Sequence, residues 1–292
     1  MIRSDLGLRL LVAGVGIPFG FAVVWAGGWV LTGVMTLLAL VACHEVIGMV
    51  KAGGGRPFDA LALILAALLV LGAGWYGEYG PWSQMAMGLV VGTTILCLAL
   101  SVFLRGVDGR PMHSVATTLL AALYVGGPLA FAVFLRQHPA ALWESASWTG
   151  TFLLVFPLLV TWVGDSSAYF GGRRFGKRKL LPSVSPNKTV EGALSGLLGT
   201  MAGAAVFTAF ALSALGGGLE LSILAAGLLG LLIGVVAQVG DLAESLLKRE
   251  AGVKDSGRLL PGHGGVMDRF DAVLFTLPLT YLLIPFFLGW GF

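Results

Sequence analysis

Four side chains in the stretch 240–250 could together bind a metal ion and a phosphate. Asp241, Glu244, Ser245 and Lys248 stand at positions i, i+3, i+4 and i+7, so a helix places them on one face. Carboxylate oxygens are hard ligands that suit Mg²⁺, which usually also keeps waters and takes phosphate oxygens. The alternative is an ordinary amphipathic helix end stabilised by pairs of residues four apart.

A second pair of carboxylates follows in the chain. Asp268 and Asp271 are spaced i, i+3 at the start of an apolar run, just after the turn 262–265. If the two helix ends lie at one membrane level, their carboxylates can hold Mg²⁺ while basic side chains hold the phosphates of a nucleoside triphosphate. The alternative for Asp268 is a surface ion pair with Arg269. Three roles are considered for His263: a hydrogen-bond donor to phosphate, an acid–base group, or a loop residue without a function in the site.

The segment 165–192 holds a further group of polar residues. Asp165 lies inside an apolar run, where a carboxylate needs a cation, a lysine or a water-filled cavity. Residues 185–189 are predicted to form a Pro turn that leads into a helix, whose free N–H groups and Lys188 suit phosphate. The hydroxyl residues of this turn could instead be only helix caps. Glu191 could be only a first-turn partner of the helix dipole.

His44 and Glu45 form a polar pair near the end of the second apolar run. They could help to bind a lipid head group. The preferred interpretation is that they contact each other or have a packing role.

The composition is that of a polytopic membrane protein. Of the 292 residues, 57% are hydrophobic and 11% are charged, and the mean hydropathy is +0.91. A helix needs about 20 apolar residues to span a bilayer. The predicted fold is therefore an all-α polytopic membrane protein with about nine transmembrane helices. The apolar runs are approximately Leu8–Trp25, Trp29–Val50, Phe58–Ala73, Trp82–Leu104, Ser114–Leu135, Trp148–Gly171, Val190–Leu215, Leu219–Val239 and Phe270–Trp290.

The distribution of basic residues predicts the orientation. With the N-terminus in the cytoplasm and nine alternating spans, 17 of the 18 Lys and Arg residues lie on the cytoplasmic side, and only Arg136 lies outside. Short loops of membrane proteins show this bias. We therefore expect a multi-pass protein of the cytoplasmic (inner) membrane, with its C-terminus on the outer side and its active site facing the cytoplasm.

The chain is expected to be a single integral membrane domain over residues 1–292. Within it, residues 1–140 are expected to form a scaffold with lipid access, and residues 141–292 to carry the catalytic motifs. The loops 171–189 and 249–265 are the long polar connections of this second half. No nucleic acid partner is expected.

Two groups of motifs resemble a known family. The pattern Ser245-x2-Lys248-Arg249-x4-Lys254-Asp255-x-Gly257-x2-Leu260-Pro261-x-His263-Gly264-Gly265-x2-Asp268-Arg269-x-Asp271 resembles the signature of the phosphatidate cytidylyltransferase (CDP-diacylglycerol synthase) family. The segments Asp165-x2-Ala168-Tyr169 and Ser185-Pro186-x-Lys188-Thr189-x-Glu191-Gly192 are similar to other motifs of that family. Asn187 departs from the pattern, since a second Lys is common there. The resemblance covers roughly the C-terminal 45% of the chain.

The resemblance implies a reaction in which a phosphate oxygen of phosphatidic acid attacks the α-phosphorus of CTP, so that CDP-diacylglycerol forms and pyrophosphate leaves. It implies Mg²⁺ on Asp241 and Asp268, with a second cation left open, and a homodimer among membrane lipids. The expected phosphate contacts are Lys188, Lys248, Arg249 and Arg269. The nucleotide pocket is expected to include Ser185, Asn187, Thr189, Ser245, Lys254, His263, Gly264 and Gly265. The expected orienting groups are Asp165, Glu191, Glu244, Asp255 and Asp271.

Two alternatives remain open at this point. One is a related CTP-dependent enzyme that acts on another lipid, such as a polyprenol or an isoprenoid lipid phosphate. The other is a cation-coupled transporter that uses Asp165 and Asp241. A transporter would place polar groups near the middle of the bilayer in paired or broken helices, whereas the polar residues of this sequence gather at one predicted membrane face.

Overall fold

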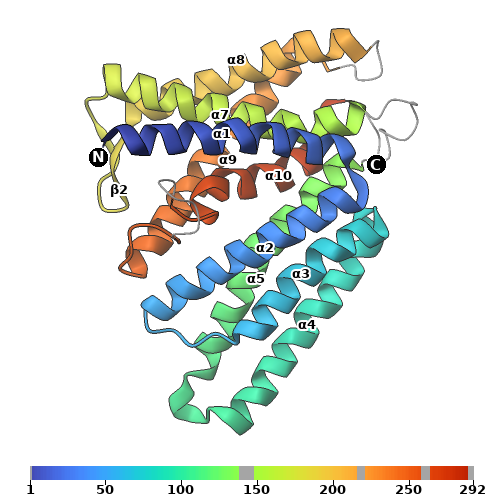
Figure 1. The fold of residues 1–292 in the computed structure, drawn as a ribbon, viewed down its shortest axis with the longest axis vertical. Coiled ribbons are helices and arrows are strands. Elements are labelled where there is room, and N and C mark those ends of the chain that lie inside the picture. The colour runs from blue at the N-terminus through green and yellow to red at the C-terminus, as the bar shows by residue number, and fades with distance from the viewer. Residues whose placement is uncertain (1, 138–147, 216–220, 258–263, 289–292) are drawn as a thin grey trace. The chain divides into compact units, whose positions relative to one another are not determined.

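The computed structural model describes residues 2–137, 148–215, 221–257 and 264–288, with side chains described from residue 14 onward and not for residues 212–215. These residues form long helices and one short hairpin (Figure 1). The elements are α1 (Ile2–Ala26), α2 (Gly28–Ala52), α3 (Asp59–Tyr76), α4 (Tyr79–Leu104), η1 (Val107–Gly109), α5 (Pro111–Arg136), α7 (Trp148–Phe175), β1 (Lys179–Leu181), β2 (Ser185–Thr189), α8 (Val190–Leu215), α9 (Ile223–Glu250) and α10 (Met267–Phe287).

The prediction of an all-α polytopic membrane protein is confirmed. Among the described residues, 8 helices are long and apolar enough to cross a membrane. A hydrocarbon environment favours helices because every backbone N–H and C=O group must find its partner within the segment. The first predicted run coincides with α1. Within α1, the side chains are described for the apolar stretch Gly14–Ala26. The count of nine spans and the orientation stay predictions.

Contacts between Cα atoms divide the chain into two compact units. Unit 1 consists of Met1–His138 and Leu247–Phe270, and unit 2 consists of Pro139–Leu246 and Asp271–Phe292. Each unit is described separately below. The predicted division at residue 140 stays a prediction.

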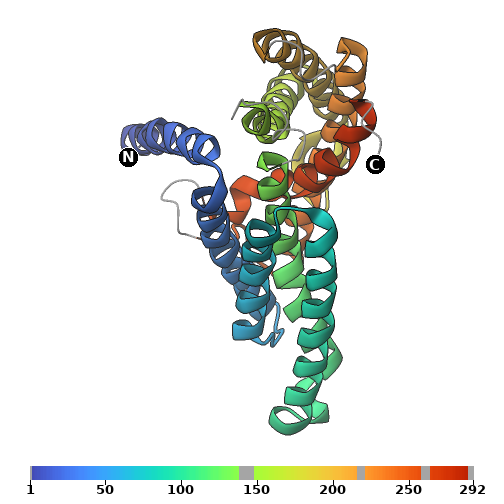
Figure 2. The ribbon, with the colours of Figure 1, turned by 90° about the vertical axis from the view of Figure 1, so that its right-hand side faces the viewer.

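In unit 1, α2, α3 and α5 pack against one another, and α4 packs on α3 and α5 (Figures 1 and 2). Close approach of α5 to α3 depends on Gly126, since an added Cβ would lie 2.7 Å from the Cα atom of Ala66. Trp82 lies in the first turn of α4 and donates from Nε1 to the carbonyl oxygen of Leu69 at 2.8 Å. Small residues at such crossings let helices approach closely where lipid gives no hydrophobic driving force.

Arg136, the basic residue that the charge rule places outside, has a local role in unit 1. Its Nε atom donates to the carbonyl oxygen of Val24 at 2.8 Å, and its Nη2 atom donates to that of Trp25 at 2.9 Å. The last carbonyls of a helix have no partner within the helix. Arg136 therefore stabilises the end of α1.

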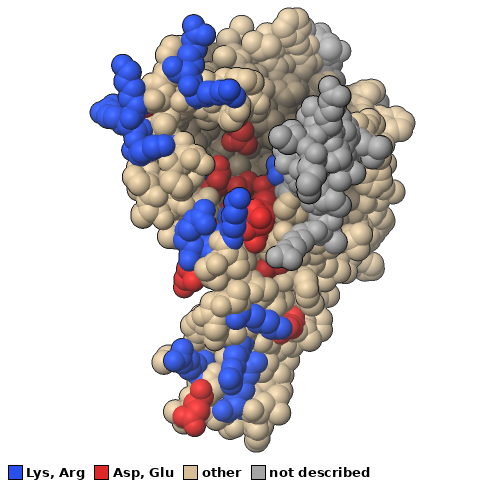
Figure 3. All heavy atoms as spheres, turned by 60° about the vertical axis from the view of Figure 1, so that its left-hand side comes forward, with Lys and Arg blue, Asp and Glu red and all other residues tan. Residues whose placement is uncertain are grey.

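Basic side chains, with acidic ones among them, gather at the end of unit 1 where α2 joins α3 and α4 joins α5 (lower part of Figure 3). Lys51 pairs with Asp59 across the first of these connections. Arg105 donates to the carbonyl oxygens of Arg56 and Pro57, and so ties the two connections together.

Unit 2 is built on the close packing of α7 against α8. Along α8, Gly192, Gly196, Gly199 and Gly203 stand four or three residues apart and face α7. An added Cβ at Gly199 would collide with Ser167 on α7. This arrangement is the small-residue packing typical of membrane helices.

Glycines also bring α9 against its neighbours in unit 2. An added Cβ at Gly234 would collide with Thr200 of α8, and one at Gly240 would lie 2.8 Å from the carbonyl oxygen of Asp271 in α10. Gly240 directly precedes Asp241. The close approach therefore places Asp241 beside α10 near Asp271, where the part of α10 that belongs to unit 2 begins.

Candidate active site

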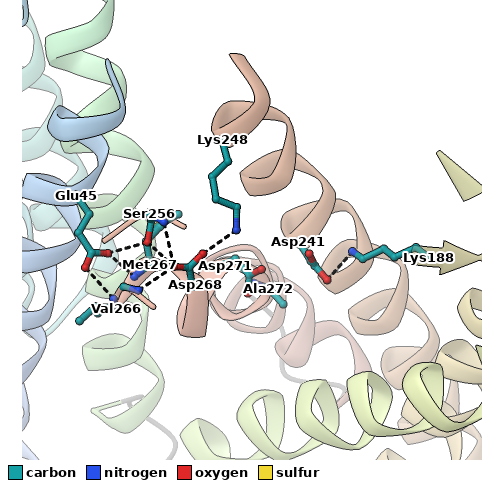
Figure 4. A network of polar contacts seen from close by, with 11 residues as sticks. Glu45, Lys188, Asp241, Lys248, Ser256, Val266, Met267, Asp268, Asp271 and Ala272 are labelled. Carbon is teal, nitrogen blue, oxygen red and sulfur yellow. Dashed lines mark hydrogen bonds and ion pairs between the residues drawn. The ribbon is translucent and has the colours of Figure 1, made fainter. Parts of the chain in front are cut away.

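Three elements of unit 2 bring together two carboxylates and a lysine. Lys188 of β2 pairs with Asp241 of α9, and their Nζ and Oδ2 atoms are 2.5 Å apart (Figure 4). The Asp165 carboxylate of α7 lies within electrostatic reach of both. The side chains of Lys188 and Asp241 are 28% and 35% exposed, so a charged ligand can reach them from water. Two carboxylates around one lysine can accept a metal ion together with a phosphate.

The hairpin that carries Lys188 differs from the predicted structure. Residues 185–189 are the second strand, not a turn, and the turn lies at 182–184, where the Val184 N–H donates to the carbonyl oxygen of Leu181 at 3.1 Å. Pro186 fits because a strand of a two-stranded sheet has an open edge and does not need every N–H group. The expectation that a helix follows at once is confirmed, since α8 begins at Val190.

The alternative that the predicted turn supplies a helix cap is confirmed for Thr189. Its hydroxyl accepts from the N–H group of Gly192 at 3.1 Å, which satisfies one free donor of the first turn of α8. Added Cβ atoms at Gly172 and Gly176 would lie close to the Thr189 hydroxyl. Thr189 is thus enclosed by the end of α7 and fixes where Lys188 leaves the strand.

Glu191 ties the connection from α7 to the hairpin. Its Oε2 atom accepts from the N–H groups of Lys177 and Arg178 at 3.0 and 3.2 Å. Arg178 also pairs with it through side chains 3.7 Å apart. Among the predicted pocket residues, Ser185 is half-buried and Asn187 is exposed. Glu191 therefore orients the hairpin, and its expected role in orienting ligands stays a prediction.

The second charged group lies in unit 1, around Asp268 of α10. Its Oδ1 atom pairs with Lys248 Nζ at 2.7 Å, and the two side chains are only 11% and 12% exposed. Its Oδ2 atom accepts from the N–H groups of Gly265 at 2.8 Å and Ser256 at 3.0 Å, and from the Ser256 hydroxyl at 2.9 Å. Asp268 is therefore a largely buried carboxylate and not part of an exposed surface pair, since Lys248 of α9 engages one oxygen and residues 256 and 265 engage the other.

Gly264 has a positive φ of 79°, a conformation that favours glycine. An added Cβ there would also lie 2.7 Å from Asp268 Oδ2. Gly265 is buried against Ser256. Residues 264 and 265 of the turn predicted to contact nucleotide therefore lie directly against the Asp268 carboxylate.

Glu45 of α2 also belongs to this group, although the sequence favoured a contact with His44 or a packing role for it. Its carboxylate accepts from the N–H groups of Val266 and Met267 at 2.9 and 2.8 Å, and the Ser256 hydroxyl, which has a single hydrogen to share between Glu45 and Asp268, lies 3.0 Å from it (Figure 4). Glu45 is only 7% exposed. A charged residue in an apolar run was the available signal, but its partners lie more than 200 positions away in the sequence.

The remaining predicted residues divide by exposure. Glu244 and Ser245 are buried on α9, and Asp271 is half-buried in the first turns of α10, where its Oδ1 atom accepts from the N–H group of Ala272. His263 lies outside the described residues. The side chains of Arg249, Lys254, Asp255 and Arg269 are exposed.

The carboxylates fit a site that substrate phosphates complete. No three or more His, Cys, Asp or Glu side chains in the described part of the chain gather closely enough to form a protein-only metal cage. Mg²⁺ seldom uses such cages and is usually bound by one or two carboxylates plus waters and phosphate oxygens. The donor set is therefore suited to Mg²⁺ that arrives with a nucleotide.

Comparison with known proteins now adds to this geometry. The family model described as the cytidylyltransferase family matches residues 7–287. The chain belongs to the cytidylyltransferase family. The match includes both charged groups, and it extends over the N-terminal half, where the sequence resemblance was confined to hydrophobicity and length.

Of three curated relatives in the cytidylyltransferase family, two are similar over nearly their whole length and the third over a little more than half. A phosphatidate cytidylyltransferase of Synechocystis is 32% identical over 95% of this chain and 97% of its own. One of Staphylococcus haemolyticus is 33% identical over 95% of this chain and 98% of its own. One of Bacillus subtilis is 40% identical over 168 residues, which are 58% of this chain and 57% of its own.

Proposed function

We propose that this chain transfers CMP from CTP to phosphatidic acid and so forms CDP-diacylglycerol, an early step of phospholipid synthesis. A phosphate oxygen of phosphatidic acid bonds to the α-phosphorus of CTP, the bond from that phosphorus to the bridging oxygen breaks, and pyrophosphate leaves with that oxygen. The observation that carries the proposal is the group of Lys188, Asp241 and Asp165 on three elements of a cytidylyltransferase-family chain. Such transfers need positioning and charge neutralisation more than covalent help.

The lysines of both charged groups are the proposed contacts for CTP phosphates. Lys188 and Lys248 are each held by a carboxylate, Asp241 and Asp268 respectively. A lysine held in this way has a fixed position before substrate binds, so less side-chain entropy is lost on binding. Its positive charge would stabilise the negative charge that develops on the leaving pyrophosphate.

Asp241 and Asp268 are the carboxylates proposed to hold Mg²⁺, and a second cation is compatible with the same donors. Bound Mg²⁺ supplies electrostatic neutralisation of the triphosphate and polarises its oxygens. Each carboxylate is paired with a lysine amine, so the proposed metal ligands and the proposed phosphate contacts are neighbours. Asp165 lies within electrostatic reach of Asp241 and is the proposed orienting group beside it.

The other motif residues have proposed roles around these groups. Glu191 positions the hairpin, and Glu244, Asp255 and Asp271 orient neighbouring ligands. The proposed contacts to the nucleotide and its phosphates are Ser185, Asn187, Thr189, Ser245, Arg249, Lys254, His263, Gly264, Gly265 and Arg269.

The protein is a multi-pass membrane protein, and we propose that its active site faces the cytoplasm. In unit 1, Lys51 and Arg105 lie near one end of the helices, whereas the rings of Trp29 and Trp75 are in contact at the other end of α2 and α3. Basic residues favour the cytoplasmic side and Trp favours the interfaces. The proposal includes nine spans, a cytoplasmic N-terminus, an outer C-terminus and a homodimer in the inner membrane.

Reconstituted protein tests the choice of lipid acceptor. Liposomes that contain the protein are given labelled CTP and Mg²⁺, with phosphatidic acid, a polyprenol or an isoprenoid lipid phosphate as separate acceptors. Thin-layer separation should show a labelled CDP-lipid only with phosphatidic acid. A labelled product from an isoprenoid acceptor, and none from phosphatidic acid, would overturn the proposal.

A further inference from the structure

We infer that Glu45 is a positioning residue that fixes the described ends of the motif loop, residues 256–257 and 264–267, and through them Asp268, for the proposed reaction. The inference rests on that proposed function, and it adds a residue from the N-terminal half of the chain. Glu45 lies on α2, whereas the proposed metal and phosphate contacts named above come from residues 185 onward.

The contacts of Glu45 are those of a cap supplied by another helix. Its two carboxylate oxygens accept from the N–H groups of Val266 and Met267. The first N–H groups of a helix have no partner within it, and α10 begins at Met267. A negative charge at that end also interacts favourably with the helix dipole. Glu45 thus caps the N-terminus of α10.

Ser256 connects this cap to Asp268. Its hydroxyl lies 3.0 Å from Glu45 Oε2 and 2.9 Å from Asp268 Oδ2, and its N–H group donates to the same Asp268 oxygen at 3.0 Å. The Gly265 N–H group donates to Asp268, and the N–H groups of the next two residues, 266 and 267, donate to Glu45. Asp268 and Glu45 are therefore bound to one short loop from two sides.

Two glycines of the loop leave the space that Glu45 fills. An added Cβ at Gly257 would collide with Glu45 Oε1, and one at Gly265 would lie 2.5 Å from Glu45 Oε2. Neither glycine has a positive φ, so close approach favours glycine at both positions: to Glu45 at Gly257, and to Ser256 and Glu45 at Gly265. The loop is shaped around Glu45 as well as around Asp268.

A glutamine at position 45 tests whether Glu45 acts by accepting hydrogen bonds or only by filling space. It keeps the size of the side chain, but its amide nitrogen cannot accept from a backbone N–H group. One N–H group of the first turn of α10 then loses its acceptor. Aspartate keeps the charge and both acceptors but is one methylene shorter, so it should restore part of the function. Asp59→Asn is the matched control, because it removes a carboxylate of the same unit that forms an ion pair with exposed Lys51.

The experiment compares wild-type, E45Q, E45D and D59N proteins in lipid nanodiscs. Amide hydrogen exchange of the peptide containing Val266 and Met267 should be faster in E45Q than in wild type and unchanged in D59N. With phosphatidic acid and CTP, E45Q should need about 10- to 100-fold more Mg²⁺ for half-maximal rate, or lose as much in kcat. E45D should lie between E45Q and wild type, and D59N should match wild type.

Unchanged exchange in E45Q would overturn the inference whatever the activities are. Faster exchange with wild-type kcat, KM and Mg²⁺ requirement would also overturn it, because the cap would then have no consequence for the reaction. If wild-type and D59N proteins form no CDP-lipid, the proposed function fails. The exchange comparison then still decides whether Glu45 holds the loop.

Discussion

The two lysine–carboxylate pairs should respond differently to the same substitution. Asp268→Asn and Asp241→Asn each remove one charge of an ion pair and keep the shape of the side chain. Asp268 and Lys248 are 11% and 12% exposed, whereas Asp241 and Lys188 are 35% and 28% exposed. Both variants should lose CTP turnover, but only Asp268→Asn should lose substantial stability.

The expected loss of unfolding free energy for Asp268→Asn follows from the burial of its ion pair with Lys248. Removing one partner of a buried, hydrogen-bonded pair costs about 3–5 kcal/mol, because the other charge is left desolvated. The amide also replaces one of the two oxygens that accept from Lys248, Gly265 and Ser256. An exposed pair contributes about 0–1 kcal/mol, and water reaches the Asp241–Lys188 pair. We therefore expect a loss of about 3 kcal/mol for Asp268→Asn and under about 1 kcal/mol for Asp241→Asn.

Thermal unfolding in a single detergent, at one heating rate, measures the difference. About 1 kcal/mol shifts the midpoint by roughly 2–4 °C for a chain of 150–250 residues. Asp268→Asn should therefore lower the midpoint by roughly 6–12 °C, and Asp241→Asn by less than about 4 °C. Equal shifts for the two variants would refute the reasoning from burial. Full CTP turnover by either variant would refute the proposed metal ligand.

Three further predictions follow from the same structure. Lys188→Gln should raise the apparent KM for CTP about 10-fold or more, since a charged contact to phosphate contributes about 1.5–3 kcal/mol; an unchanged KM and kcat in steady-state assays would argue against the phosphate contact. Gly171→Ala should lower the free energy of unfolding by about 1–3 kcal/mol, because the added Cβ collides with Ser195. The control for this is Gly92→Ala on α4, which has no neighbour within 4 Å and should leave the thermal midpoint unchanged. EDTA should abolish CDP-lipid formation and added Mg²⁺ should restore it; turnover in EDTA would exclude the metal proposal.

The helices could be predicted because one physical requirement dominates the sequence. Apolar runs of about 20 residues must become helices in a bilayer, and each predicted run coincides with a helix. The ends were less accurate: the eighth run was predicted to begin at Leu219, whereas α9 begins at Ile223. Polar residues near helix ends give no clear apolar boundary, so only capping contacts decide where the helix begins.

The hairpin β1–β2 could not be predicted from local patterns. Its strands have three and five residues, and strands this short do not give a recognisable alternation of polar and apolar residues. Pro186 favoured a turn on propensity alone. Glu191, which binds the N–H groups of Lys177 and Arg178, is the contact that holds the preceding chain in place.

The residue types of the candidate site could be predicted, but their pairing could not. Lys188 and Lys248 were both expected to contact phosphate, and the structure adds that each is held by a particular aspartate. Glu45 shows the limit most clearly. Its partners Val266 and Met267 are brought to it by tertiary packing alone, and no helical or strand periodicity connects residues so distant in the sequence.

The position of the label in CTP tests the central claim most directly. Purified protein in liposomes with phosphatidic acid and Mg²⁺ is given CTP labelled either at the α-phosphate or at the γ-phosphate. The account predicts that the α-label enters the lipid and the γ-label is released as pyrophosphate in equal amount, and that Asp241→Asn abolishes both. Transfer of the γ-label to the lipid, or no transfer of either label, would contradict it.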